Sequence, residues 1–291
     1  MANPKNGVAE APKIQPSAFG LLAVVKPENA SNENEWTRGF SQEWETELYS
    51  ATNWDDTDST SGEVVAAGAP NRYTVIKPWF IEAEEQISTM GFKGLDRIAR
   101  ITRQLEGVTQ HAMELELWDG AIRLGESHAN RALVDPAATK LNSGTALSAR
   151  RALALLEHQI GQVSDGGEQG IIHMTRDVAA LLASNSNMLF HEEGKDHLQT
   201  LGGTPVIVGS GYTGNGPVGA TGATASDTNK WIYATGTVKT YLGDVDVVND
   251  NLAQAYDVSG NQNDMKLKAI RPAAAYFDTS IHLAVRVDLS A

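Results

Sequence analysis

The chain has 291 residues, of which 41% are hydrophobic, so it is long enough to bury one large core or two ordinary ones. It contains no cysteine, which excludes disulfides, thiolate metal sites and thiol catalysis. Its formal net charge of −13 argues against a protein that reads nucleic acid through a basic surface. The first residues carry no apolar signal segment, and no run approaches the ~18 apolar residues of a membrane span, so we expect neither secretion nor a membrane anchor.

Residues 1–35 are predicted to form an extended arm, because prolines at 4, 12, 16 and 27 break any regular helix. Their one apolar run, Phe19–Val25, needs a groove on the body or on a neighbour, and we expect the arm to become ordered only on assembly. From Glu28 to Glu63 the chain carries ten acidic residues and one base, Arg38. This stretch is either a solvated segment or a surface that meets basic groups on a neighbouring chain.

Residues 36–82 are predicted to form a long two-stranded hairpin. The segment holds four of the six tryptophans, and its centre is polar and turn-forming. Flanking stretches such as Arg72–Ile76 suit strands, and two strands of ~15 residues would each reach ~50 Å. Because an isolated hairpin is only marginally stable, its aromatic side chains indicate packing against another surface.

The clearest helix signal covers residues 95–117 and ends at Trp118–Asp119–Gly120. Gly107 inside it costs ~1 kcal/mol relative to alanine, which makes this residue a candidate kink. The apolar stripe expected to face the core consists of Leu95, Ile98, Ala99, Thr102, Leu105, Val108, Ala112 and Leu115.

After an irregular stretch at 118–143, an α/β region is predicted. It comprises a helix over 145–163, a buried strand over 170–174, a helix over 177–183 capped by Thr175, and a strand ending at Val208. Six glycines within 209–226 predict a flexible loop, and 231–242 alternates as a strand does. In the last strand one face is apolar and the other mixed. The apolar face contains Ile281, Leu283, Val285, Val287 and Leu289.

No motif in the chain supports catalysis. His191 and His197 lie six residues apart around a glycine, which is not a metalloprotease spacing, so we expect a solvated loop there. The glycine-rich stretch lacks the lysine of a phosphate loop, and no nucleophile elbow is present. We therefore predict no catalytic, cofactor-binding or metal-binding residue and no enzyme activity. The basic residues Arg97, Arg100, Arg103, Arg150 and Arg151 are expected on salt-bridging faces at subunit contacts.

The order of these segments resembles that of tailed-bacteriophage major capsid proteins with the Hong Kong 97-like fold, which is an α+β fold. ALSARRALALLEHQIGQV followed by GIIHMTRDVAALLAS looks like the strand, turn and helix of the family's axial domain. TLGGTPVIVGSGY and WIYATGTVKTYLG look like the strands that follow. KLKAIRPAAAYFDTSIHLAVRVDL looks like the closing return to the peripheral domain.

The resemblance implies a division of the chain into named parts. These are an N-terminal arm (1–35), an extended β-hairpin loop (36–82), a peripheral domain with the spine helix 95–117 (83–143), an axial domain (144–243) and a C-terminal return to the peripheral domain (244–291). The glycine-rich loop 209–226 would then lie near the axial domain. The arrangement of 118–143 stays open.

The resemblance also implies a function. Copies would form pentamers and hexamers that close into an icosahedral shell around double-stranded DNA, without reading its sequence. The implied partners are the chain itself, a separate scaffolding protein, a portal and a decoration protein, and the location is a virion capsid assembled in the host cytoplasm. Two alternatives are a shell of the encapsulin type, which encloses a cargo enzyme, and a decoration or tail protein. An alternative of another class is a metal-dependent hydrolase that uses His191 and His197.

Overall fold

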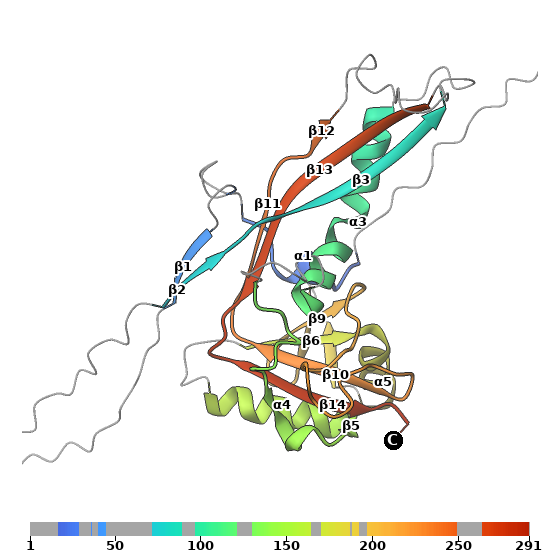
Figure 1. Cartoon of the computed structure of the whole chain (residues 1–291). Coiled ribbons are helices and arrows are strands. Elements are labelled where there is room, and N and C mark those ends of the chain that lie inside the picture. The colour runs from blue at the N-terminus through green and yellow to red at the C-terminus, as the bar shows by residue number, and fades with distance from the viewer. Residues whose placement is uncertain are drawn as a thin grey trace, which may run out of the picture.

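The computed structural model describes residues 17–28, 36, 40–44, 72–88, 97–120, 130–163, 170–186, 188–191, 197–248 and 264–290. These residues form an elongated part, made of a four-stranded sheet and helix α3, above a compact part made of an eight-stranded sheet with helices α4 and α5 (Figure 1). The mixture of helices and sheets agrees with the predicted α+β class.

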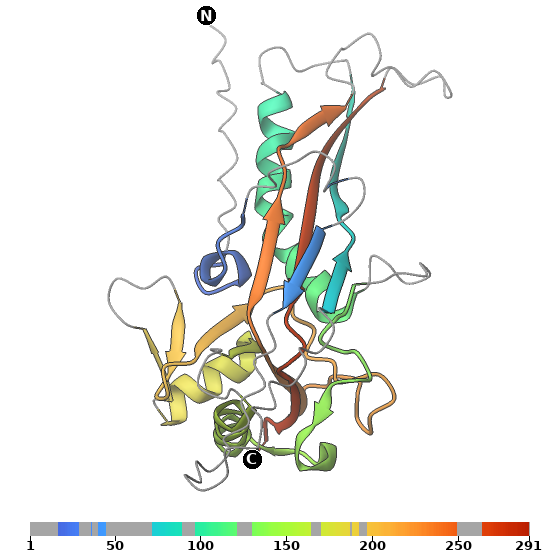
Figure 2. The same ribbon diagram turned by 90° about the vertical axis from the view of Figure 1, so that its left-hand side faces the viewer.

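The four-stranded sheet is built around one long central strand. It consists of β3 (Trp79–Ser88), β11 (Val238–Leu242), β12 (Asp246–Val248) and β13 (Asp264–Phe277). β13 pairs antiparallel with β3 along one side and with β11 and β12 along the other. Helix α3 (Arg97–Asp119) runs along one face of this sheet (Figure 2). Apolar side chains of the helix and of both long strands share one cluster, which includes Ile101, Leu105, Ile81 and Leu267.

The eight-stranded sheet lies at the other end of the molecule. In spatial order its strands are β4 (Thr139–Lys140), β14 (His282–Asp288), β10 (Asn229–Thr235), β6 (Ile171–Thr175), β9 (Pro205–Gly209), β8 (Leu198–Thr200) and β7 (Leu189–His191), and β5 (Leu147–Ser148) also pairs with β14. Helices α4 (Ala149–Val163) and α5 (Arg176–Ser186) follow β5 and β6 directly. A short 3-10 turn, η2 (Leu141–Gly144), joins β4 to β5.

Both faces of this sheet are buried, because each packs against different elements. Ile232, Val285 and Val206 face a cluster that includes the apolar sides of α4 and α5. The residues between them, such as Tyr233 and Ala284, face a second cluster that contains the end of α3. The alternation expected for the last strand is therefore present, but its second face is also covered. Burial of both faces explains why the strand core tolerates alanine and aromatic residues where a solvent-facing strand would carry polar ones.

The strand pairing connects the two sheets in two places. β11 belongs to the four-stranded sheet through β13, whereas the preceding β10 lies in the eight-stranded sheet. β14 belongs to the eight-stranded sheet through β10, whereas the preceding β13 lies in the four-stranded sheet. The chain thus crosses from one sheet to the other after Thr235 and again after Phe277. Sequence periodicity shows that a segment is a strand, but the choice of partner depends on contacts distant in the sequence.

Helix α3 confirms the predicted helix, displaced by two residues at each end, but not all of the predicted buried face. Ile98 and Val108 are 43% and 41% exposed, whereas Ile101 and Met113 are fully buried. Near its C-terminal end the helix is buried on several sides, so even Glu114 and Glu116 lie in the interior. The helix remains one element through Gly107 and ends where Gly120 adopts a positive φ of 62°.

The described residues include the base of the predicted hairpin. β1 (Phe40–Trp44) pairs antiparallel with β2 (Arg72–Ile76) over five residues each. The further length of the two predicted strands of ~15 residues falls outside the described part. Trp79–Glu82, assigned to the hairpin from the sequence, instead begins β3 in the four-stranded sheet. Phe40 stacks on Tyr241 at 4.3 Å between ring centroids, so the base of the hairpin packs on the sheet, as its aromatic content predicted. The residues between the two strands lie outside the described part.

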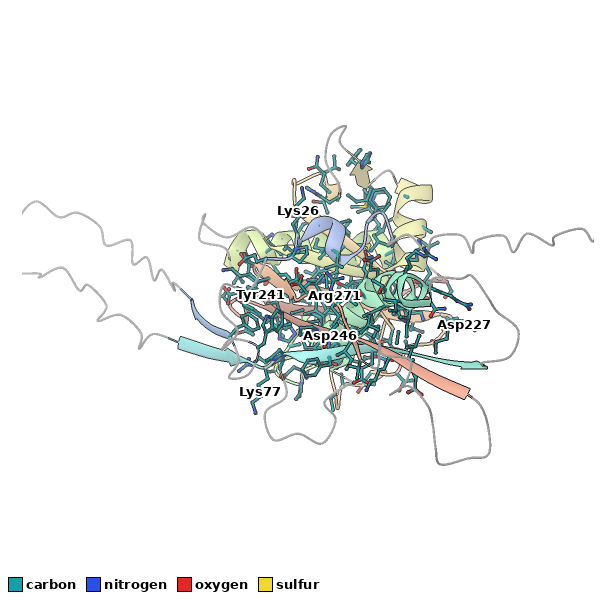
Figure 3. All side chains as sticks on the ribbon, turned by 90° about the horizontal axis from the view of Figure 1, so that it is seen from above. Lys26, Lys77, Asp227, Tyr241, Asp246 and Arg271 are labelled. Carbon is teal, nitrogen blue, oxygen red and sulfur yellow. The ribbon has the colours of Figure 1, made fainter. Side chains whose placement is uncertain are left out.

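Arm residues 17–28, here called the docked arm, lie on the body of their own chain. The docked arm contains a single helical turn, α1 (Leu21–Val24), with Leu21 completely buried. Phe19 accepts a hydrogen bond from the backbone of Val208 at 2.8 Å, and Glu28 donates one to Thr240 at 2.8 Å. Its Lys26 lies on the helix side of the four-stranded sheet and Lys77 on the opposite side (Figure 3). The apolar run of the arm thus lies in a groove on the body of its own chain, one of the two places that the sequence analysis allowed.

The structure buries only part of the predicted apolar stripe of α3, and two matched substitutions test this assignment. Leu105→Ala should lower the free energy of unfolding by about 2–5 kcal/mol, because it leaves a cavity at a fully buried position. Val108→Ala should change it by no more than about 0.5 kcal/mol, because that side chain is largely exposed. Urea unfolding followed by circular dichroism measures both. Equal losses would show that the face is assigned wrongly.

Candidate functional site

The buried carboxylate of Glu114 joins three parts of the chain that are distant in sequence. Its Oε1 accepts the backbone N–H of Leu21 at 2.9 Å and the side-chain amide of Gln110 at 2.8 Å. Its Oε2 accepts the backbone N–H of Gly211 at 2.8 Å and the hydroxyl of Ser210 at 3.1 Å. Helix α3, the docked arm and the loop after β9 therefore converge on one side chain, and we call this cluster the Glu114 junction.

Four donors are what an ionised carboxylate needs when no water reaches it. Glu114 is 0% exposed, and an unpaired buried charge would cost several kcal/mol. Each oxygen here accepts two hydrogen bonds, so the acceptor capacity of the group is used. Glycine at 211 is required by the same contact, since a Cβ atom there would clash with the backbone oxygen of His111. At the junction, the backbone of the loop at Gly211 thus lies directly against the backbone of α3, next to the Glu114 carboxylate.

The glycine-rich loop that supplies two of these donors is ordered, not flexible as predicted. Ala220 donates to the carbonyl of Pro217 at 2.9 Å, and Ala223 donates to that of Ala220 at 3.1 Å. Gly219 and Gly222, the third residues of these two successive turns, have φ of 79° and 69°, as type II turns require. Gly216 then donates to Ala223 at 2.6 Å and closes the pair of turns.

This double turn is fastened to the face of the eight-stranded sheet. The indole N–H of Trp231 donates to the carbonyl of Gly222 at 2.8 Å, and a Cβ atom at Gly222 would clash with the guanidinium of Arg286. On the other side, Trp118 at the end of α3 donates to the carbonyl of Asn215 at 3.1 Å. The glycines are therefore needed for close packing against aromatic and arginine side chains. In a flexible loop they would not have this role.

A second buried polar group, His173 on β6, connects the loop to the sheet. Its Nδ1 lies 2.9 Å from the hydroxyl of Tyr212, and its Nε2 lies 2.9 Å from that of Thr235. Because the Thr235 hydroxyl donates to the carbonyl of Gly236, it is assigned as the acceptor for Nε2–H, and Tyr212 then donates to Nδ1. Burial, with a smaller contribution from His282, lowers the pKa of His173 to about 3, so the ring is neutral.

The residues that suggested metal chemistry do not form a site in the described part of the chain. His191 ends β7, where it pairs with Leu198 of β8 and its ring lies edge-on to Phe19. His197 directly precedes β8, and the residues between the two histidines lie outside the described part. In the ranges described, no three histidine, aspartate or glutamate side chains gather as metal ligands do. In those ranges, too, no helix is both long and apolar enough to cross a membrane.

Comparisons with known proteins identify the fold. No protein-family model and no curated protein matches the sequence. Among solved structures, the capsid of a native GTA particle aligns over 99% of this chain and 95% of its own, at a TM-score of 0.58 and 11% identity. A structure of Microbacterium phage Oxtober96 aligns over 99% and 96% (TM-score 0.54, 13% identity), and one of Gordonia phage Cozz over 98% and 91% (TM-score 0.52, 12% identity).

The chain has a Hong Kong 97-like capsid fold. The predicted resemblance is confirmed at the level of the fold, because the alignments cover almost the whole chain and almost the whole of each phage or particle chain. The elements that carry or adjoin the Glu114 junction, α1, the end of α3 and β9, lie close together where the elongated part meets the compact part (Figure 1). The junction therefore links segments from both parts.

Sequence reasoning did not single out the residues that form this junction. Glu114 lies outside the apolar stripe that was expected to face the core, and a glutamate in an amphipathic pattern is normally exposed. His173 was included in a buried strand without a role. One signal could have pointed to the loop: the spacing of Gly219 and Gly222 after Pro217 repeats a type II turn pattern. No comparable signal marks Glu114.

We expect Glu114→Gln to lower the free energy of unfolding by about 2 kcal/mol or more. The glutamine side chain has no charge, and its NH2 group would face at least one of the four hydrogen-bond donors that now point at the carboxylate. Glu106→Gln, an exposed position on the same helix, should have little effect. Thermal and urea unfolding measure the difference. Hydrogen exchange at the backbone of Leu21 and Gly211 should also accelerate in the Glu114 variant alone, and unchanged exchange would contradict the junction.

Acid should destabilise the fold through its buried histidines. The pKa of His173 is lowered to about 3, and burial also lowers that of His282. Below the unfolded-state pKa of 6.5 the unfolded chain binds protons that the folded chain does not. The free energy of unfolding therefore has its full value above pH 6.5 and decreases as the pH drops toward 3. For His173 the loss approaches about 1.4 kcal/mol per pH unit between these two pKa values.

Urea titrations between pH 7.5 and 5 test this dependence. Burial raises the pKa of Asp119, and this change acts on stability in the opposite direction. His173→Gln should flatten the slope, whereas His158→Gln, at an exposed position on α4, should leave it as in the wild type. A wild-type stability that stays constant over this range would show that the ring is not held neutral by burial.

Proposed function

We propose that the chain is a structural major capsid protein that self-assembles into an icosahedral shell enclosing double-stranded phage DNA. The observation that carries this proposal is the alignment of the whole chain with capsid structures, from the arm to the final strand. Additional support comes from the architecture. The chain presents an elongated sheet-and-helix part and a paired hairpin that projects to one side (Figure 1), shapes suited to contacts with neighbours.

The proposal also assigns each part of the chain to a domain of the capsid fold. The four-stranded sheet with α3 would be the peripheral domain, the eight-stranded sheet with α4 and α5 the axial domain, and β1–β2 the base of the extended loop. Pentamers and hexamers would form through these parts. A separate scaffolding protein, a portal and a decoration protein are proposed partners, and assembly would take place in the host cytoplasm.

A non-enzymatic role fits the polar groups of the described interior. The carboxylate of Glu114 and the ring of His173 are saturated by hydrogen bonds within the protein, so neither is presented to a substrate. In this proposal the buried polar groups hold the subunit in one shape. Metal analysis of the purified chain tests the alternative hydrolase, which requires bound metal at His191 and His197.

The expressed full-length chain, purified by size exclusion, should show uniform shells or capsomer rings in negative-stain electron microscopy. If a scaffolding protein is required, rings will predominate until it is added. A monomer or small oligomer that persists in its presence would contradict the proposed function. Nuclease-protected DNA inside particles from infected cells would support the phage shell, whereas a protein cargo would support the encapsulin alternative.

A further inference from the structure

The outer side of α4 carries basic side chains and no carboxylate of its own. The apolar inner side of the helix packs on the eight-stranded sheet. Arg150, Arg151 and His158 are exposed on the opposite side. The one glutamate of the helix, Glu157, is turned away from them and accepts a hydrogen bond from Thr204 at 3.1 Å.

The two arginines of this surface are not neutralised by the part of the chain that the structure describes. No acidic side chain in that part pairs with either of them, although Arg100 pairs with Glu85 at 3.3 Å and Lys230 with Asp177 at 4.0 Å. Both arginines also lie in the first turn of α4, where the helix dipole disfavours positive charge and no acidic residue compensates it. Their charges thus favour an anionic partner from outside the described chain.

The surface between these basic side chains is low and open. Ala154 lies between Arg151 and His158 along the exposed side of the helix. Two turns beyond Ala154, a Cβ atom placed on Gly161 would meet no other atom within 4 Å. A chain segment can therefore lie along the helix and bring its own side chains beside the guanidinium groups.

A segment with the complementary charge belongs to the same sequence. Residues 45–71 contain no lysine, arginine or histidine. Their formal charge of −6 is nearly half of the −13 of the whole chain, and it comes from Glu45, Glu47, Asp55, Asp56, Asp58 and Glu63. These residues lie outside the described part, but their composition and length are known from the sequence.

The described hairpin base carries this segment away from the body. Residues 45–71 follow β1 and precede β2, which are paired with each other, so the chain goes out and returns within them. With ~13 residues in each direction at ~3.3 Å per residue, the segment reaches up to ~40 Å. The hairpin projects to one side of the molecule, whereas α4 lies at the far end of the compact part (Figure 1).

We infer that residues 45–71 of one copy dock on the basic outer side of α4 in a second copy. The inference rests on the proposed function and names one of its subunit contacts. Two acidic segments cannot pair with each other, because their carboxylates would repel. The contact is therefore head-to-tail: each copy gives its acidic segment to one neighbour and accepts that of another on α4.

The sequence of the segment suits the chemistry of the helix surface. Trp54 directly precedes Asp55 and Asp56, as Arg150 and Arg151 are neighbours on α4. A guanidinium group can accept an aromatic ring against its plane and donate two hydrogen bonds to one carboxylate. Local complementarity of this kind offsets the overall repulsion between copies of a chain with net charge −13.

Charge reversal in the full-length chain tests the contact. Arg150→Glu with Arg151→Glu, and separately Asp55→Lys with Asp56→Lys, should each reduce the assembled fraction in sedimentation velocity by about tenfold or more, because like charges then meet. An equal mixture of the two variants should recover at least about half of the wild-type fraction, since alternating copies restore opposite charges. A chain with all four changes should recover it too.

Matched controls separate this contact from the effect of total charge. Lys140→Glu with Arg176→Glu changes the net charge as the α4 variant does, at exposed positions outside α4. Glu106→Lys with Asp227→Lys does the same for the acidic variant. Both controls should assemble as the wild type does, and thermal unfolding establishes that every variant folds. Recovery in the fourfold variant but not in the mixture would place the contact within one chain and overturn the inference.

Cysteine cross-linking detects the contact even if no shell forms. The natural chain has no cysteine, so a disulfide forms only between introduced residues. Full-length Asp56→Cys chains, mixed with affinity-tagged Ala154→Cys chains under mild oxidation, should give a mixed dimer on a non-reducing gel. Val218→Cys in place of Ala154→Cys is the control, because Val218 is 61% exposed on the loop after β9, and it should give about tenfold less.

The outcomes distinguish failure of this inference from failure of the proposed function. Mixed dimers and recovery in the mixture, without shells in electron microscopy, would remove the proposed function and keep the contact. Shells that tolerate both charge reversals and give no mixed dimer above the control would overturn the contact and keep the function. A loss of packaged DNA in the α4 variant with unchanged assembly would also overturn it, because the partner of α4 would then be the phosphate backbone.

Discussion

One buried carboxylate joins three segments of the chain that are far apart in the sequence. Glu114 binds the docked arm through Leu21 and the glycine-rich loop through Gly211, and it does so from the last turns of α3. Since a buried charge tolerates no loss of its donors, the three segments must be placed together or not at all. The geometry of both sheets follows, because α3 packs along the four-stranded sheet and the loop lies on the face of the eight-stranded one.

The two sheets form one body because the chain passes between them more than once. β10 and β11 are consecutive yet belong to different sheets, and so do β13 and β14. The docked arm spans the same boundary, with Phe19 bonded to β9 and Glu28 to β11. A chain joined in this way resists rotation of one part against the other.

The sequence predicted elements well and contacts poorly. Helices near 97–119 and 149–163 and the final strand were found from periodicity, since one apolar face repeats at a fixed step. The exposed positions of Ile98 and Val108 were missed, because the stripe was chosen without knowledge of which neighbours cover the helix. The partners of β11 and β14 could not be predicted, because pairing is decided by segments far apart in the chain. The six glycines within 209–226 were noticed, but their close packing against Trp231 and Arg286 cannot be predicted from composition.

The central place of the last strand has a consequence for folding. β14 lies between β10 on one side and β4 and β5 on the other. The docked arm binds Thr240, which follows it by more than two hundred residues in the chain. Both contacts close very long loops, and their entropy must be lost before the strand pairs and the core stabilise the fold. We therefore expect the completed sheet to form late and slowly in the folding reaction.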